Sequence, residues 1–180
     1  MRREPPKQWI GVLPYALIAA GALFRIVPHP PNFAPLGAIA LFGGAVLPPP
    51  WGVLTPITAL ALSDVAVLGY YPGAVWVYGS FVLISLLGMA LLRRRTVFRI
   101  AGASLGASIL FFIVTNLGEW FGPLYPHTLA GLRQDYIAAI PFFRNTVISD
   151  LGYSLALFGI YASAQRLVRP SLGRLHAAPH

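Results

Sequence analysis

The few side chains that could do chemistry in this sequence are ionisable or amide groups near the ends of long apolar runs. The 180 residues include five Asp and Glu, four His and no Cys. The absence of Cys excludes disulfides, thiolate catalysis and Cys-ligated metal. Groups of both charges, together with amides, could instead hold a small and partly polar ligand. The candidates are Arg25, His29, Asn32, Asp64, Asn116, Glu119, Arg133, Asp135, Arg144, Asn145 and Asp150.

Catalytic and metal-binding functions have weaker support in the sequence. There is no paired-carboxylate motif of a membrane protease and no phosphate-binding P-loop. His29, His127 and Glu119 could bind a metal, but no pair of ligands on one helix accompanies them. His176 and His180 have helical spacing, but a proline lies between them and disfavours a regular helix. We therefore expect no catalytic residue, no metal site and no cofactor.

The composition predicts where the candidate residues lie. The chain is 57% hydrophobic and only 10% charged, whereas soluble domains carry about 25% charged residues. This contrast predicts an integral membrane protein, with residues 1–180 as one transmembrane domain. In a soluble protein the net charge of +8 would suggest nucleic acid. In a membrane protein the positive charge is better explained by basic residues that keep the chain ends in the cytoplasm. We therefore expect no nucleic-acid partner.

Six apolar runs are candidates for membrane-spanning helices of about 20 residues. The first resembles a signal peptide, but it lacks a convincing small-residue cleavage site, so we expect a retained helix. The second is short and bounded by prolines, and could be a re-entrant segment. The runs cover residues 9–27, 35–47, 51–69, 74–92, 98–116 and 145–168.

Three clusters of basic residues predict the orientation of these helices. Lys and Arg near membrane segments stay on the cytoplasmic side. If all six runs cross, the three clusters share that side, but a re-entrant second run would place the middle cluster outside. We therefore expect six crossings, with residues 1–8 and 169–180 cytoplasmic. The clusters are Arg2, Arg3 and Lys7; Arg93, Arg94, Arg95 and Arg99; and Arg166, Arg169 and Arg174.

Most candidate residues then fall on the outer face, in or beside the connections 28–34, 70–73 and 117–144. The connection 117–144 is a long outer loop rich in aromatic residues, and a short helix over 129–140 could lie across the outer face. Within the loop, Trp120 and Tyr125 could stack on a ligand or cap it. Many polar groups at one depth with aromatic residues above them are typical of a binding pocket under a lid.

Two carboxylates are expected inside the bilayer, where a charge is costly and normally faces a cavity or a partner. Asp64 and Asp150 should therefore point into the bundle. Asp64 could equally form a plain buried pair with Arg25, and the sequence leaves that alternative open. On the last helix, polar and small residues at helical spacing form one stripe, which should face inward. The stripe consists of Asn145, Ser149, Gly152, Tyr153 and Ala156.

Small residues four apart allow another helix to approach closely. Ala16 and Ala20 form such a pair on the first helix, where a partner subunit is an alternative to packing inside the bundle. On the fifth helix, Gly102 and Gly106 with the neighbouring alanines are expected to pack inside the bundle.

Four segments, residues 25–35, 38–45, 115–120 and 139–146, resemble a bacterial family of small integral membrane proteins of uncharacterised function. That family is similar to the substrate-binding S components of energy-coupling factor (ECF) transporters, including the solitary cobalamin-binding type. The resemblance implies an all-α bundle of six transmembrane helices in the bacterial inner (plasma) membrane. It also implies capture of a vitamin from outside, with Ala16 and Ala20 matching the motif that docks a T subunit and its ATPases. Ligation of cobalt by Cys, which occurs in the cobalamin group, is impossible here.

The first hypothesis is therefore a substrate-binding membrane component that takes up a vitamin-like molecule, with cobalamin a candidate. Two alternatives stay open: a membrane enzyme acting on a lipid or prenyl substrate, and a structural subunit without ligand. The expected ligand-binding residues are the eleven charged and amide residues named first, together with Trp120, Tyr125 and Tyr153.

Overall fold

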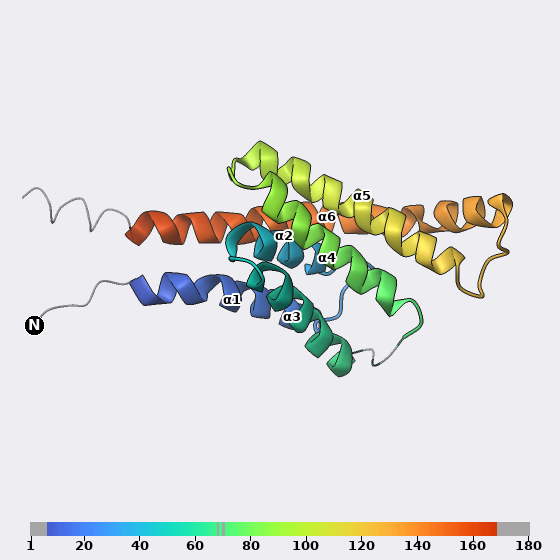
Figure 1. Cartoon of the computed structure of the whole chain (residues 1–180), viewed down its shortest axis with the longest axis horizontal. Coiled ribbons are helices and arrows are strands. Elements are labelled where there is room, and N and C mark those ends of the chain that lie inside the picture. Colours follow the sequence, from blue (N-terminus) through green and yellow to red (C-terminus); the bar gives the residue numbers. More distant parts are fainter. Residues whose placement is uncertain (1–6, 68, 70, 169–180) are drawn as a thin grey trace, which may run out of the picture.

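The computed structural model describes residues 7–67, 69 and 71–168, and these residues form an all-helical bundle (Figure 1). Arg2, Arg3, Arg169 and Arg174 of the basic clusters, and His176 and His180, lie outside the described residues. The helices are α1 (Lys7–Phe24), α2 (Leu36–Val46), α3 (Trp51–Val67), α4 (Ala74–Leu91), α5 (Val97–Trp120) and α6 (Leu129–Val168).

Local signals account for several helix ends. The prolines at 48–50 follow α2 after Leu47, and proline cannot continue a helix. Gly73 precedes α4 with φ of 82°, a left-handed conformation that glycine adopts without steric penalty. Thr96 caps α5, because its hydroxyl oxygen accepts a hydrogen bond from the backbone N–H of Arg99 at 3.4 Å.

The region expected as a long loop, 117–144, is mostly helical. Helix α5 continues to Trp120, and residues 129–140 join the last run in one helix of 40 residues that includes Pro141. Side-chain packing between α5 and α6 favours the longer helices: Phe112 contacts the rings of Tyr136 and Phe143, and the Tyr136 hydroxyl donates to the carbonyl oxygen of Ile113 at 2.8 Å. Only residues 121–128 connect the two helices, which project together beyond the rest of the bundle (Figure 1).

Helix α2 lies at the centre of the bundle and contacts each of the other five helices. It has 11 residues, of which 37–44 are buried. Its contact with α4 is close enough to require glycine at two positions. A Cβ atom at Gly44 would overlap the carbonyl oxygen of Ser85, and one at Gly88 would overlap the carbonyl oxygen of Leu41. The backbones of α2 and α4 are therefore in direct contact.

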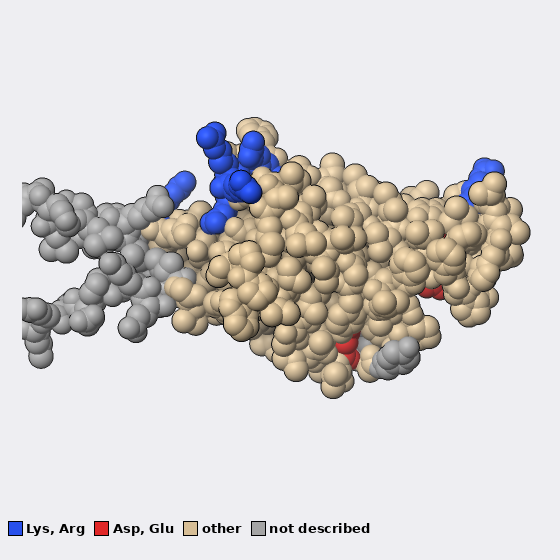
Figure 2. Space-filling model, in the orientation of Figure 1, with Lys and Arg blue, Asp and Glu red and all other residues tan. Residues whose placement is uncertain are grey.

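Successive helices run in opposite directions along the long axis of the molecule (Figure 1). The start of α1, the α4–α5 connection and the end of α6 lie toward one end, which we call the basic end. Lys and Arg side chains gather there around the α4–α5 connection, and a separate group lies at the tip where α5 meets α6 (Figure 2). The α1–α2, α3–α4 and α5–α6 connections lie toward the opposite end.

The surface and length of the helices are those of a membrane protein. Helices α4, α5 and α6 are long and apolar enough to cross a membrane, while the apolar parts of α1, α2 and α3 are shorter. Every helix except α2 exposes large apolar side chains, such as Leu62 on α3 (68% exposed) and Phe98 on α5 (89%). Apolar surface of this extent on several sides suits contact with lipid.

Candidate functional site

A cavity of about 430 Å³ lies where the end of α1, the connection 25–35, the start of α2 and the middle of α6 meet. Its walls combine apolar side chains from α4 and α5 with a few polar groups. Four residues predicted from the sequence are brought together here, three from the connection 25–35 and one from α6. They are Arg25, His29, Asn32 and Asp150.

The connection 25–35 is held against α6 by hydrogen bonds. The side-chain amide of Asn145 donates to the carbonyl oxygen of Pro31, and the hydroxyl of Ser149 donates to that of Ala34, both at 3.0 Å. Asn32 has φ of 58°, a left-handed conformation that Asn tolerates better than most residues. Asn145 and Ser149 of the predicted inward stripe therefore face the connection and fix one wall of the cavity. Neither lines the cavity itself.

Asp150 is the most deeply buried carboxylate at the cavity, with 2% of its surface exposed. It accepts a hydrogen bond from the Ser108 hydroxyl at 2.8 Å, and the backbone N–H of Ala38 lies on the side of α2 that faces it. The start of α2 therefore points at the carboxylate, and the positive end of the helix dipole stabilises a negative charge there. Gly37 permits this arrangement, because a Cβ atom at that position would overlap the Asp150 oxygens.

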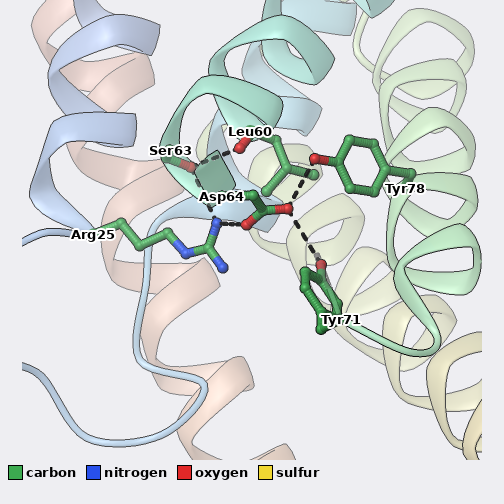
Figure 3. A network of polar contacts seen from close by, with 6 residues as sticks. All are labelled: Arg25, Leu60, Ser63, Asp64, Tyr71 and Tyr78. Carbon is green, nitrogen blue, oxygen red and sulfur yellow. Dashed lines mark hydrogen bonds and ion pairs between the residues drawn. The ribbon is translucent and has the colours of Figure 1, made fainter. Parts of the chain in front are cut away.

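Arg25 forms an ion pair with Asp64, and both side chains are mostly buried, at 10% and 6% exposed (Figure 3). The same guanidinium nitrogen donates to the Ser63 hydroxyl at 3.1 Å. The second Asp64 oxygen accepts from the hydroxyls of Tyr78 at 2.8 Å and Tyr71 at 3.3 Å. Burial and the nearby Asp64 charge raise the pKa of Tyr71 to about 12, so its hydroxyl stays protonated and donates.

This network separates the roles of its two charges. Arg25 lines the cavity, whereas Asp64 does not and reaches the cavity only through Arg25. The plain buried pair considered for Asp64 is therefore what the structure contains. The two tyrosines complete the carboxylate's hydrogen bonds, so that Asp64 fixes the position of Arg25.

A smaller cavity of about 290 Å³ adjoins the first and shares Asn32, Phe111 and Thr146 with it. Asn116, a predicted site residue, lies in this second cavity. Its side-chain amide donates to the carbonyl oxygen of Phe112 one helical turn earlier, at 2.6 Å.

The remaining predicted residues lie away from both cavities. Helices α5 and α6 extend beyond the bundle, and several of these residues lie at the tip where the two helices meet. There, the indole N–H of Trp120 donates to the carbonyl oxygen of Pro126 at 3.0 Å, and its ring meets the His127 ring edge-on. Trp120 thus stabilises the turn 121–128. Besides Asp64 and Asn145, the predicted residues lining neither cavity are Glu119, Trp120, Tyr125, Arg133, Asp135, Arg144 and Tyr153.

Three of these residues have distinct surroundings. Tyr153 packs its ring edge-on against Phe24 and Phe33, with centroids 5.5 and 6.2 Å apart. Arg144 is exposed on α6. Asp135 is buried at 3% exposed, and its Oδ2 atom has no hydrogen-bond partner within the described part of the chain. The outer polar layer expected from the sequence is therefore divided between the cavity and the tip.

Some residues of the cavity and its supporting network were not predicted. Thr146 lines both cavities and lies one helical turn before Asp150, so helical spacing alone could have identified it. Tyr71, Tyr78 and Ser108 bind the buried carboxylates from other elements. No local signal pairs these residues with Asp64 or Asp150.

The small-residue pairs on α1 and α5 have different surroundings. Ala16 and Ala20 are exposed on the outer side of α1. On α5, Ala103 and Ala107 are buried at 4% and 1% exposed. On α5 the alanines therefore pack inside the bundle, but Gly102 of the predicted pair is exposed, and nothing lies within 4 Å of a Cβ atom there. The α1 pair lies on the outer surface of the bundle.

The comparisons with known proteins give one family. A model described as a family of unknown function (DUF6580) matches residues 7–172. No curated protein and no solved structure matches the chain. Among residues 7–67, 69 and 71–168, no group of three or more His, Cys, Asp or Glu residues could hold a metal ion.

Proposed function

The chain belongs to the DUF6580 family, and from the cavity beside α2 we propose that it is a membrane-embedded binding component that captures a vitamin-like small molecule from the outer side. One observation carries this proposal. Arg25, His29 and Asn32 of the connection 25–35 and Asp150 of α6 converge on a single cavity of about 430 Å³. Ligand sites in proteins commonly have volumes of about 300–1,000 Å³, with mostly apolar walls and a few placed polar groups.

The polar groups indicate the kind of ligand that fits. A guanidinium has five N–H donors, and one Arg25 nitrogen points away from Asp64 in Figure 3. Arg25 therefore has donors left for a carbonyl or carboxylate of a ligand. His29 and Asn32 add groups that can donate or accept, and Phe81 and Phe111 offer apolar surface for a ring. A compact vitamin fits this volume, whereas cobalamin would need both cavities to open into one.

The arrangement supports binding better than catalysis. Asp64 is engaged by Arg25 and two tyrosines, and Asp150 by Ser108 and the start of α2. The two carboxylates therefore lie in separate networks and do not form an acid–base pair. No particular observation favours the lipid-modifying enzyme or the ligand-free subunit.

Retention of a small molecule tests the proposed function. We expect a vitamin-like compound to copurify with detergent-extracted protein and to be identified by mass spectrometry. In equilibrium dialysis of that compound, Asp150→Asn should weaken binding about 10- to 100-fold, as expected for the loss of a charged hydrogen bond. Arg144→Gln, an exposed change on the same helix, should bind like wild type. Absence of any ligand in repeated preparations, or equal binding by Asp150→Asn, would exclude this site.

The proposal includes six membrane crossings in a bacterial inner membrane, with both chain ends in the cytoplasm. The alternating helix directions and the gathering of basic residues around the α4–α5 connection support it (Figures 1 and 2). Helix α2 alone would span only about 16 Å. In the proposed arrangement α2 crosses the membrane together with the connecting segments at its two ends, and the other helices surround it and separate it from lipid.

Labelling of single cysteines tests the orientation. Leu124→Cys at the α5–α6 tip should react with an impermeant thiol reagent in intact cells, because that side chain is 66% exposed. Arg94→Cys at the basic end should react only after lysis, and it leaves the Thr96 cap in place. The opposite labelling pattern would invert the topology and place the cavity on the cytoplasmic side.

The exposed Ala16 and Ala20 are proposed to dock an energising partner such as a T subunit with its ATPases, because small residues let a partner helix approach closely. Ala16→Leu and Ala20→Leu should lower uptake in cells at least 10-fold while the purified protein keeps its ligand affinity. Val12→Leu, on an exposed and already bulky position of the same helix, is the control. Unchanged uptake would show that no partner docks on this face.

A further inference from the structure

A second large hollow lies at the basic end, far from the proposed ligand cavity. It has a volume of about 760 Å³ and is formed by residues near the α4–α5 connection, the start of α5 and the last turns of α6. Three exposed arginines line it: Arg93, Arg95 and Arg166. Ile100 and Phe158, which are buried at 5% and 4% exposed, give it an apolar floor.

Among the described residues, no acidic side chain balances the positive charge of this hollow. No Asp or Glu lines it, and the ion pair found among the described residues, Arg25–Asp64, belongs to the other site. The guanidinium of Arg95 lies over the ring of Tyr161, 5.9 Å from its centroid. This contact positions the arginine without neutralising it. The start of α5, with Val97 in the lining, adds the positive end of a helix dipole.

The hollow continues into apolar surface on the outside of the bundle. Leu155 on α6 and Val97 on α5 both line it, and they are 42% and 64% exposed. A ligand bound in this hollow would therefore contact the arginines in one part of the hollow and apolar side chains in the other part. An inorganic anion would use only the first part, whereas an amphiphile with an anionic head would use both.

We propose that this hollow binds one anionic phospholipid, with its phosphate at Arg93, Arg95 and Arg166 and an acyl chain along the groove between α5 and α6. The planar guanidinium group matches phosphate geometry with two parallel hydrogen bonds. Basic pockets between transmembrane helices on the cytoplasmic side are a recurring way of holding anionic lipid headgroups. This site lies apart from the ligand cavity; the inference rests on the proposed orientation, with the basic end in the cytoplasm, but not on ligand capture at that cavity.

Native mass spectrometry of the full chain in detergent tests the proposal, with dioleoylphosphatidylglycerol and dioleoylphosphatidylcholine as probes. We expect the anionic lipid to bind at least 10-fold more tightly. The triple variant Arg93→Gln, Arg95→Gln, Arg166→Gln should weaken its binding on the order of 100-fold, about fivefold for each charge. Arg133→Gln with Arg144→Gln, which removes exposed charges outside the hollow, should leave it unchanged.

A second variant tests the apolar half of the hollow. Leu155→Trp should fill the groove and lower the affinity for phosphatidylglycerol at least 10-fold while all three arginines remain. Equal affinity for the two lipids, or unchanged binding by the triple variant, would overturn the proposal. Displacement of the lipid by millimolar inorganic phosphate, together with no effect of Leu155→Trp, would also overturn it and indicate a free-anion site. Thermal unfolding of each variant without lipid checks that the fold is intact.

Discussion

Asp64→Leu is expected to destabilise the protein by about 3–5 kcal/mol, the usual cost of leaving one partner of a buried ion pair alone. Arg25 would then stay charged with a side chain only 10% exposed. Arg25→Met should cost clearly less. An arginine keeps its charge at any pH that proteins tolerate, whereas a carboxyl group left without a cation can bind a proton and keep its hydrogen bonds to hydroxyl groups. The two halves of the pair should therefore differ in the effect of their removal.

The double variant Arg25→Met, Asp64→Leu completes this test. It should recover most of the stability lost in Asp64→Leu, because no unpaired charge remains. It should not recover ligand binding, because Arg25 lines the cavity. Thermal unfolding in detergent and ligand dialysis measure the two effects, with the exposed Arg144→Met as control. Equal stability of Asp64→Leu and wild type would mean that the buried pair does not hold the bundle together.

Gly44→Ala is expected to destabilise the protein by more than about 3 kcal/mol, at the upper end of overpacking effects. The added methyl group would overlap the backbone carbonyl of Ser85 on α4. Backbone cannot move aside as a flexible side chain can, so α2 and α4 would have to separate. Because α2 contacts every other helix, that separation should disturb the whole bundle.

Gly79→Ala provides a matched control on α4, since nothing lies within 4 Å of a Cβ atom at that position. It should be neutral or stabilise by up to about 1 kcal/mol, because Ala favours a helix interior over Gly. The amount of monodisperse protein after detergent extraction and the unfolding midpoint report on both variants. A Gly44→Ala protein as stable as Gly79→Ala would mean that the α2–α4 contact is looser than described.

Most helix positions were predictable because the signals are local. The second run, 35–47, agrees with α2 to within one residue at each end, since prolines bound it on both sides. The exception is the region 117–144. The sequence predicted a long loop there, with a short helix over 129–140, but packing of Phe112 against Tyr136 and Phe143 joins residues 129–144 to the last helix. Such packing depends on residues more than 20 positions apart, which periodicity does not detect.

The candidate site was predictable as a set of residues but not as a geometry. Arg25 and Asp150 were expected to act together with the aromatic residues at 120 and 125. The structure leaves the first two at the cavity and places the others at the tip. The length of α5 decides this division, and a prediction that ends the helix at 116 cannot reveal it. The assignment of a vitamin, of an energising partner and of six crossings stays a prediction.

The burial of α2 has a consequence for how the protein is made. Synthesis proceeds from the N-terminus, so α2 leaves the ribosome before α4, α5 and α6, which will cover most of it. Until those helices follow, this short glycine-rich segment has only α1 and α3 as partners. A nascent chain stopped after α3 should therefore be recognised by membrane quality-control proteases, whereas one that includes α4 has the closest neighbour of α2 in place. The innermost helix of the bundle thus depends on neighbours that are made after it.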